Sequence, residues 1–250
     1  MNRFRCDCGV LALVALLGFP AVSSAQLTGV EDGEWRYLGG DAGHTRSAPL
    51  LNQIDASNFS ALEVAWIWQG NNSGGGVEYT SRSTPVFVNG VLYTVTGQRR
   101  QVVAIDAATG ERLWTFREPE TMRYLRSPRT DFGKGVAYAE VDGRGVIYIT
   151  TPGFFLWALD AKTGRPLENW GASVPLEYFS ETGVVDLIPD LVEDWVPWQS
   201  HLARGERYDP DHGIPRELGM VTSSAPPIVV NGVVVVLIGH EPSYDQTRIE

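Results

Sequence analysis

The chain has 250 residues, of which 43% are hydrophobic and 20% are charged, so it can form a packed core and is not disordered, collagen-like or a coiled coil. Its 20 basic and 30 acidic residues give a net charge of −10, which argues against nucleic acid or an anionic membrane surface as partner. Glycine, proline and aromatic residues are abundant. This composition favours many short strands, so we expect an all-β protein built as one large domain or two small ones.

Residues 1–25 have the pattern of a secretory signal peptide. Basic residues precede an apolar run at 10–19, and small residues at 23–25 predict cleavage after Ala25. The apolar run is shorter than the roughly 20 residues that span a bilayer. We therefore expect an exported mature chain without a membrane span. Both cysteines, Cys6 and Cys8, would leave with the signal peptide.

A repeating unit of about 54 residues follows. Residues 104–114 (AIDAATGERLW) recur at 158–168 (ALDAKTGRPLE), and residues 89–93 (NGVLY) recur at 144–148 (RGVIY). Two separate markers keep nearly the same spacing, which indicates a true repeat rather than a chance match.

Each unit is expected to contain four antiparallel strands, which is the size of a β-propeller blade. In the first unit the predicted strands are 84–88, 91–96, 102–106 and 112–116, with a hairpin turn at Asn89-Gly90. Asp106 and Thr109 are expected to cap the turn before Gly110, which supplies a positive φ. Trp114 is expected to pack its ring between blades.

The units divide the mature chain, 26–250, into an N-terminal segment at 34–69, a first blade at about 80–117, a second at about 134–170 and the start of a third at about 221–250. An insertion at about 171–220, with a short helix around 186–195, is expected to cover one face of the blades. About three blades are too few to close a ring, since propellers typically need 4–8. We expect the chain to be the front part of a longer protein; assembly with something else that covers its open edges is the alternative.

Several motifs resemble the pyrroloquinoline quinone (PQQ) dependent dehydrogenases, the periplasmic quinoprotein alcohol and glucose dehydrogenases. They are WRYLGGD (35–41), RSAPL (46–50), NQI (52–54), Ala65-Trp66, the repeat at 104–114 and GVAY (135–138). The resemblance covers nearly all of residues 34–250. It implies an eight-bladed propeller with tryptophan-docking repeats, in which PQQ and one Ca²⁺ lie on the axis and an alcohol or sugar hydroxyl is oxidised. It also implies a cytochrome c or a membrane quinone as electron acceptor, and a catalytic aspartate beyond Glu250.

The resemblance assigns cofactor contacts to individual residues. Lys134 takes the place of a cation that pairs with a PQQ carboxylate, although lysine lacks the bidentate fork of arginine. Ser223, with Thr222 as the alternative, and Gly239 match cofactor positions of the third unit. Glu241 matches the Ca²⁺ ligand, a role that suits a hard oxygen donor, and the metal would polarise the quinone carbonyl; an ordinary strand-end acid is the alternative. His240 is a candidate cofactor contact, with an ordinary loop histidine as the alternative.

Three departures from the family pattern keep a second function open, a non-catalytic propeller that acts as a protein-binding scaffold in the cell envelope. Arg82 stands where the family has a glutamate, and Glu168 stands where a tryptophan is expected, with Trp170 as a possible substitute. The vicinal cysteine pair of some members is absent, as in the sugar-oxidising branch. We expect most of the remaining basic cluster to be solvated loop charges, one or two of them facing the cofactor: Arg99, Arg100, Arg123, Arg126 and Arg129.

Overall fold

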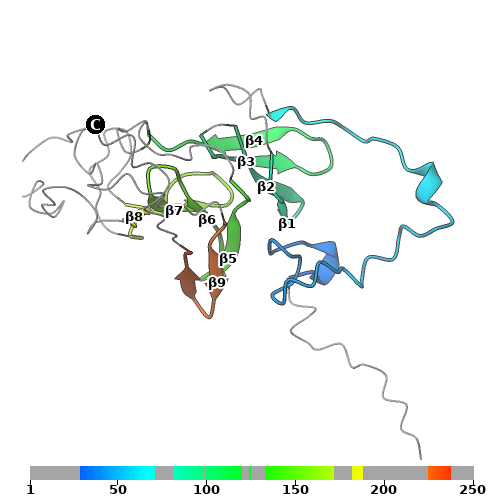
Figure 1. Cartoon of the computed structure of the whole chain (residues 1–250), viewed down its shortest axis with the longest axis horizontal. Helices are drawn as coiled ribbons and strands as arrows, with labels where there is room; N and C mark the ends of the chain where they lie inside the picture. Colours follow the sequence, from blue (N-terminus) through cyan, green and yellow to red (C-terminus); the bar gives the residue numbers. More distant parts are fainter. Residues whose placement is uncertain are drawn as a thin grey trace, which may run out of the picture.

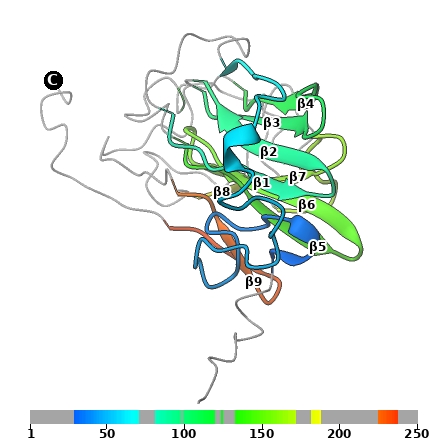
Figure 2. The ribbon, with the colours of Figure 1, turned by 90° about the vertical axis from the view of Figure 1, so that its right-hand side faces the viewer.

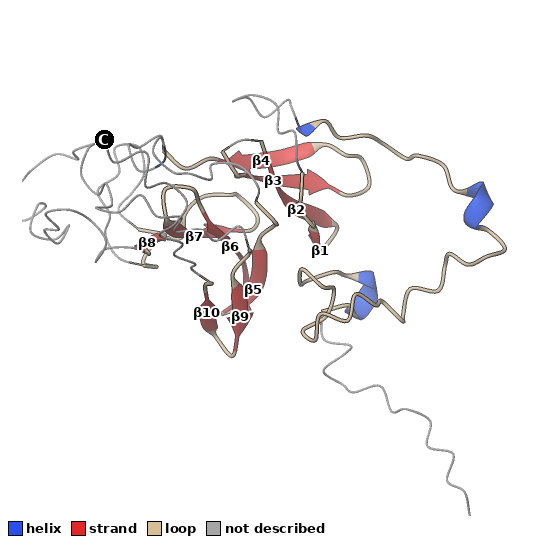
Figure 3. Cartoon of the chain, viewed as in Figure 1, coloured by secondary structure: helices blue, strands red, loops and turns tan. Residues whose placement is uncertain are grey.

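A computed structural model of the chain describes residues 29–70, 81–97, 99–119, 124, 133–171, 182–187 and 225–237. Its elements are two short 3-10 helices, η2 (Glu31–Gly33) and η3 (Phe59–Ala61), and ten strands (Figures 1 and 3). The strands are β1 (Val86–Val88), β2 (Val91–Thr96), β3 (Gln101–Asp106), β4 (Arg112–Phe116), β5 (Ala137–Val141), β6 (Arg144–Thr150), β7 (Phe155–Asp160), β8 (Val184–Asp186), β9 (Ile228–Val230) and β10 (Val233–Val235).

The strands form two four-stranded antiparallel sheets and one hairpin. The first sheet has the order β1-β2-β3-β4, the second has the order β5-β6-β7-β8, and β9 pairs with β10. The order of each sheet follows the chain, because a tight turn or short loop joins most neighbouring strands. The all-β class and the four-stranded units predicted from the sequence are confirmed.

Three hairpins turn on a residue pair in which both members have a positive φ. The φ angles are 50° and 77° at Asn89-Gly90, 51° and 74° at Asp142-Gly143, and 50° and 75° at Asn231-Gly232. This is the type I′ geometry, whose twist matches that of the flanking strands. The Asn-Gly signals at the first and third turns therefore predicted the hairpins correctly.

The second hairpin turns two residues earlier than the repeat alignment suggests. The repeat alignment holds for the pairing of the second strand with the third in each sheet. Tyr93 pairs with Ala104, and the equivalent Tyr148 pairs with Ala158. The turn, however, lies at Asp142-Gly143 and not at Arg144-Gly145, since β5 and β6 stay paired as far as Val141 and Arg144.

β8 lies inside the range predicted as an insertion. Val184 and Val185 pair with Trp157 and Leu156 on the free edge of β7, so a distant segment completes the second sheet. Asp186 belongs to this strand and not to the helix expected around 186–195; residues 188–195 of that helix lie outside the described residues.

The core lies between the facing surfaces of neighbouring sheets, which pack against each other (Figure 2). Between the first and second sheets, the rings of Phe116 and Trp157 lie 5.1 Å apart, and Trp157 is fully buried. The other face of the second sheet packs against Val229 and Val234 of the hairpin. Trp157 thus packs between the two sheets.

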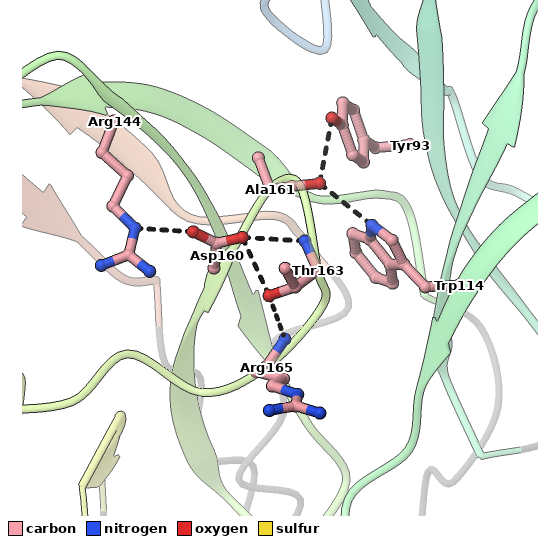
Figure 4. Close-up of polar contacts among 7 residues, drawn as sticks. All are labelled: Tyr93, Trp114, Arg144, Asp160, Ala161, Thr163 and Arg165. Carbon is pink, nitrogen blue, oxygen red and sulfur yellow. Dashed lines mark hydrogen bonds and ion pairs between the residues drawn. The ribbon is translucent and has the colours of Figure 1, made fainter.

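Trp114 docks the first sheet onto the second. The Trp114 indole N–H donates to the carbonyl oxygen of Ala161 at 3.0 Å, and the Tyr93 hydroxyl donates to the same oxygen at 3.2 Å (Figure 4). The Trp114 ring lies so close to Gly164 that an added Cβ there would be 2.5 Å from it. The prediction that Trp114 packs between units is therefore confirmed.

The N-terminal segment repeats this docking on the first sheet. The Trp66 indole donates to the carbonyl of Ala107 at 3.0 Å, and an added Cβ on Gly110 would lie 2.7 Å from its ring. Further along the segment towards the N-terminus, Trp35 exchanges two backbone hydrogen bonds with Phe87 of β1, at 2.9 and 2.8 Å. The segment thus binds the β1 edge of the first sheet and the turn between β3 and β4.

The docking turns have the predicted caps. Asp106 accepts hydrogen bonds from the Thr109 amide and hydroxyl, and Asp160 accepts the same pair from Thr163 (Figure 4). Asp160 also accepts a 2.6 Å bond from Arg144. Burial raises the pKa of Asp160, but the bonds from Arg144 and Thr163 outweigh it and hold this pKa below the usual value.

Trp170 makes the ring contact with the second sheet that Glu168 cannot make. Glu168 is exposed, whereas the Trp170 ring lies 5.6 Å from Tyr148, much as the Trp114 ring lies 5.9 Å from Tyr93. The Gly183 amide donates to the Trp170 carbonyl at 2.7 Å, which binds the start of β8 to the chain at Trp170. The ring contact is therefore restored from a different position in the sequence.

Replacement of Gly164 by alanine is expected to weaken the docking of the first two sheets. Gly164 has a φ of 70° and contacts Trp114, whereas Gly143 has a φ of 74° and no atom within 4 Å of an added Cβ. Both substitutions cost about 1–2 kcal/mol for the left-handed backbone, and Gly164→Ala adds about 1–3 kcal/mol for the steric clash. Urea unfolding of the full-length protein measures the difference; equal costs for Gly164→Ala and Gly143→Ala would contradict the contact.

Asp160→Asn is expected to lower the melting temperature in a pH-dependent way. A carboxylate whose pKa is lowered by folding stabilises the protein above its unfolded pKa, and this contribution disappears as the pH falls through the folded value. The melting temperatures of wild type and Asp160→Asn should therefore differ near neutral pH and converge below about pH 4. Asp142→Asn, in the hairpin turn of the same sheet, is the control, and a difference that persists at acid pH would contradict this role.

Candidate functional site

The connections at one end of the sheets converge on a common region. Because neighbouring strands are antiparallel, β1, β5 and β9 begin at the end where β2 and β6 finish. We call the described residues there the site end: 81–85, 97, 99–100, 117–119, 133–136, 151–154 and 225–227. The docking turns, 106–110 and 160–164, lie at the opposite end, which we call the turn end.

Lys134 is fixed at the seam between the first two sheets. Its carbonyl oxygen accepts a 2.9 Å hydrogen bond from the Thr84 amide, which joins the approach to β5 with the approach to β1. The next residue, Gly135, has a φ of 144°, and an added Cβ there would lie 2.8 Å from the Thr84 carbonyl oxygen. Glycine therefore permits this close approach, and the exposed Lys134 side chain lies beside the seam.

A second hydrogen bond joins the first two sheets at the site end, between Gly153 and Glu118. Glu118, which follows β4, is 3% exposed and accepts a 2.9 Å hydrogen bond from the Gly153 amide between β6 and β7. The role of Glu118 could not be read from the sequence, because a glutamate after a strand carries no signal of a partner 35 residues away.

The site end is rich in cations although the chain is acidic overall. Five basic residues lie in its connections: Arg82, Arg99, Arg100, Arg117 and Lys134. Glu118 is the single carboxylate among the described site-end residues, and Asp186 ends the neighbouring outer strand. The site end therefore has an excess of positive charge, which suits an anionic ligand.

Two arginines of this group are held by the fold. The Arg99 guanidinium lies 4.6 Å from the centre of the Tyr124 ring, a cation–π distance, and Arg100 is only 4% exposed. The interpretation as solvated loop charge is therefore wrong for Arg100, because the loop between β2 and β3 packs against Gly133. Arg123, Arg126 and Arg129 lie outside the described residues.

Of the predicted cofactor and metal residues, the structure places Lys134. The others lie outside the described residues: Thr222, Ser223, Gly239, His240 and Glu241. In the sequence they precede β9 or follow β10. Within the described ranges, no three histidine, cysteine, aspartate or glutamate side chains gather as a metal site, and no helix is long and apolar enough to cross a membrane.

Comparison with known proteins links this arrangement to quinoproteins. The sequence profile of the PQQ family, described as “Glucose/ethanol/alcohol dehydrogenase, beta-propeller domain”, matches residues 35–248. The chain is 32% identical to the quinohemoprotein alcohol dehydrogenase ADH IIB of Pseudomonas putida over 185 residues, which are 74% of this chain and 25% of that protein. It is 30% identical to the glycerol dehydrogenase large subunit of Gluconobacter thailandicus over 239 residues, which are 92% of this chain and 27% of that protein.

A solved structure supports the fold. The quinohemoprotein alcohol dehydrogenase ADHIIG of Pseudomonas putida HK5 matches with a TM-score of 0.53 and 25% identity over 83% of this chain and 23% of that chain. Each four-stranded sheet is thus a blade of an incomplete β-propeller, as the sequence predicted. The chain spans about a quarter of the length of the curated relatives it matches.

Proposed function

Because the chain belongs to the PQQ family of glucose, ethanol and alcohol dehydrogenase propeller domains, we propose that it forms part of a quinoprotein dehydrogenase that oxidises an alcohol or sugar hydroxyl. The observation that carries this proposal is the position of Lys134. An exposed cation lies beside the seam of two blades, at the end where cations outnumber carboxylates.

The residues of the site end fit PQQ, which carries three carboxylates. A lysine ammonium forms charge-assisted hydrogen bonds with a carboxylate, and these are about twice as strong as neutral ones. When bound, PQQ supplies the quinone that accepts two electrons from the hydroxyl-bearing carbon. The chain itself supplies the cations that bind and orient the anion, and the Thr84–Lys134 and Gly153–Glu118 contacts keep the two blades in register around it.

We propose that residues of the third blade complete the part of the cofactor site that this chain provides. Ser223 and Gly239 contact the cofactor, with His240 beside them, and Glu241 binds Ca²⁺ through its carboxylate oxygens. The resemblance assigns the catalytic aspartate to none of these residues, so their proposed role is to hold and orient the cofactor. These roles rest on the family resemblance and on the positions of these residues around β9 and β10.

Export to the periplasm, with a cytochrome c or a membrane quinone as electron acceptor, is part of the same proposal. It rests on the signal-peptide pattern of residues 1–25 and on the resemblance. Glu168 was one of the three departures that kept a non-catalytic scaffold open as the alternative. This departure weighs less, because Trp170 makes the ring contact that Glu168 cannot make.

Lys134→Ala is expected to weaken PQQ binding by about 10–100-fold, since a hydrogen bond to a charged group contributes about 1.5–3 kcal/mol. Isothermal titration of the full-length apoprotein with PQQ measures this change. Lys162→Ala is a matched control, because Lys134 and Lys162 are the two lysines of the chain and Lys162 is exposed at the turn end. Equal dissociation constants for both variants would contradict the role of Lys134, and a wild type that binds no PQQ would overturn the proposed function.

Glu241→Gln is expected to raise the Ca²⁺ concentration needed to reconstitute the full-length protein with PQQ, because an amide is a weaker ligand for a hard cation than a carboxylate. The quinone absorbance of the chelator-treated protein, followed during titration with Ca²⁺, measures this requirement. Glu168→Gln, an exposed glutamate at the rim of the second blade, is the control. If Glu241→Gln titrates like the wild type, Glu241 is not a metal ligand.

A further inference from the structure

Residues 34–44 of the N-terminal segment lie beside the first strands of all three units (Figure 2). Trp35 exchanges two backbone hydrogen bonds with Phe87 of β1, at 2.9 and 2.8 Å. The Arg36 guanidinium lies 5.8 Å from the centre of the Tyr138 ring in β5. Across a small cavity, the segment also faces β9 and the chain that leads into it. One short segment thus meets β1, β5 and β9 together.

Each of these three strands is an edge of its sheet. The strand orders are β1-β2-β3-β4 and β5-β6-β7-β8, and β9 pairs with β10. A propeller arranges its blades around a central channel, so strand edges that converge on one segment form the wall of that channel. Residues 34–44 therefore lie in the channel and not on the outer rim of the blades.

The segment is anchored at the turn end. The Glu34 carboxylate, which is 9% exposed, accepts a 2.9 Å hydrogen bond from the Asn89 amide in the first hairpin turn. Arg36 forms an ion pair with Glu34, and its second partner, Glu140 of β5, is 3.6 Å away. Glu34 and Arg36 therefore bind groups from two blades and hold the segment between them.

The segment leaves little free space between itself and the blades. Tyr37 and Gly40 pair in a tight reversal, and Leu38 lies 3.9 Å from the position of a Cβ added to Gly135 at the seam. The cavity that remains next to β5 and β9 measures about 100 Å³. A water molecule takes about 30 Å³ of liquid volume, whereas ligand pockets typically measure about 300–1,000 Å³. The cavity therefore suits a few water molecules and leaves no room for a ligand to pass.

We propose that residues 34–44 plug the central channel of the propeller at the turn end, so that a ligand or substrate enters the channel from the site end. A closed end keeps bulk water from reaching a bound ligand from behind, and this strengthens the electrostatic interactions inside the site. The plug closes the channel whichever ligand binds at the site end, so its test needs no cofactor.

Thiol labelling of the full-length protein tests the plug. Residues 9–250 contain no cysteine, so each variant adds one thiol to this part of the chain, and peptide mass mapping follows its reaction with a maleimide. Ala137→Cys places the thiol in the wall of the cavity covered by the segment, and Val141→Cys places it on the same strand where the side chain is 42% exposed. The thiol at 137 is expected to react at least about tenfold more slowly than the thiol at 141, because it reacts only when the segment opens.

Arg36→Ala is expected to speed the labelling of Ala137→Cys by about threefold to tenfold. It removes a partly exposed ion pair and a cation–π contact that hold the segment against the blades. Arg112→Ala is the matched control, since Arg112 is an exposed arginine of β4, and it should leave the rate unchanged. Ala158→Cys, fully buried in β7, reports unfolding and should stay unreactive in both backgrounds.

Equal labelling rates for Ala137→Cys and Val141→Cys would mean that the channel is open, and the proposal would be overturned. It would also be overturned if Arg36→Ala left the rate of Ala137→Cys unchanged. If Arg36→Ala speeds Ala137→Cys and Ala158→Cys alike, the segment does not open apart from the whole fold, and the plug is wrong. A wild type that binds no PQQ would overturn the proposed function and leave the plug standing.

Discussion

The docking of a tryptophan onto the turn of the next blade is the contact on which the arrangement of the blades depends. The Trp114 indole combines one hydrogen bond, to the Ala161 carbonyl, with a large apolar ring that lies over Gly164. The acceptor is a backbone atom, so the turn must have the correct conformation, and the glycine must leave room for the ring. Trp66 meets the same conditions on Ala107 and Gly110, so two successive interfaces use the same kind of contact.

These contacts influence which residues meet at the other end of the blades. Neighbouring blades that dock in the same orientation bring the starts of their first strands together, so Thr84 reaches the Lys134 carbonyl. The seam is narrow because Gly135 has no side chain, and Glu118 closes it further out. A ligand at the site end thus faces groups from two blades at once, and the rigidity of the site derives from packing at a distance from it.

The sequence was sufficient where a local signal determines the structure. The Asn89-Gly90 hairpin and the Asp106–Thr109 cap depend on residues within a few positions of each other, and they were predicted correctly. Contacts between distant segments were not. β8 is a three-residue strand whose partner, β7, is determined by the open edge of the sheet. Lys134 was singled out through its family motif and lies at the seam, whereas nothing in the sequence pointed to Glu118, because its partner amide lies in another blade.

The repeat that builds the fold also distributes the charge. Each docking turn needs an aspartate, Asp106 or Asp160, whose carboxylate accepts hydrogen bonds from the threonine three residues later. Each of the two described docking turns therefore places a carboxylate at the turn end, where the turn itself stabilises it. The site end has no such requirement, and cations predominate in its connections. A chain with a net charge of −10 can thus present a positive end to an anionic ligand, because the motif that joins the blades holds part of the acidic charge at the opposite end.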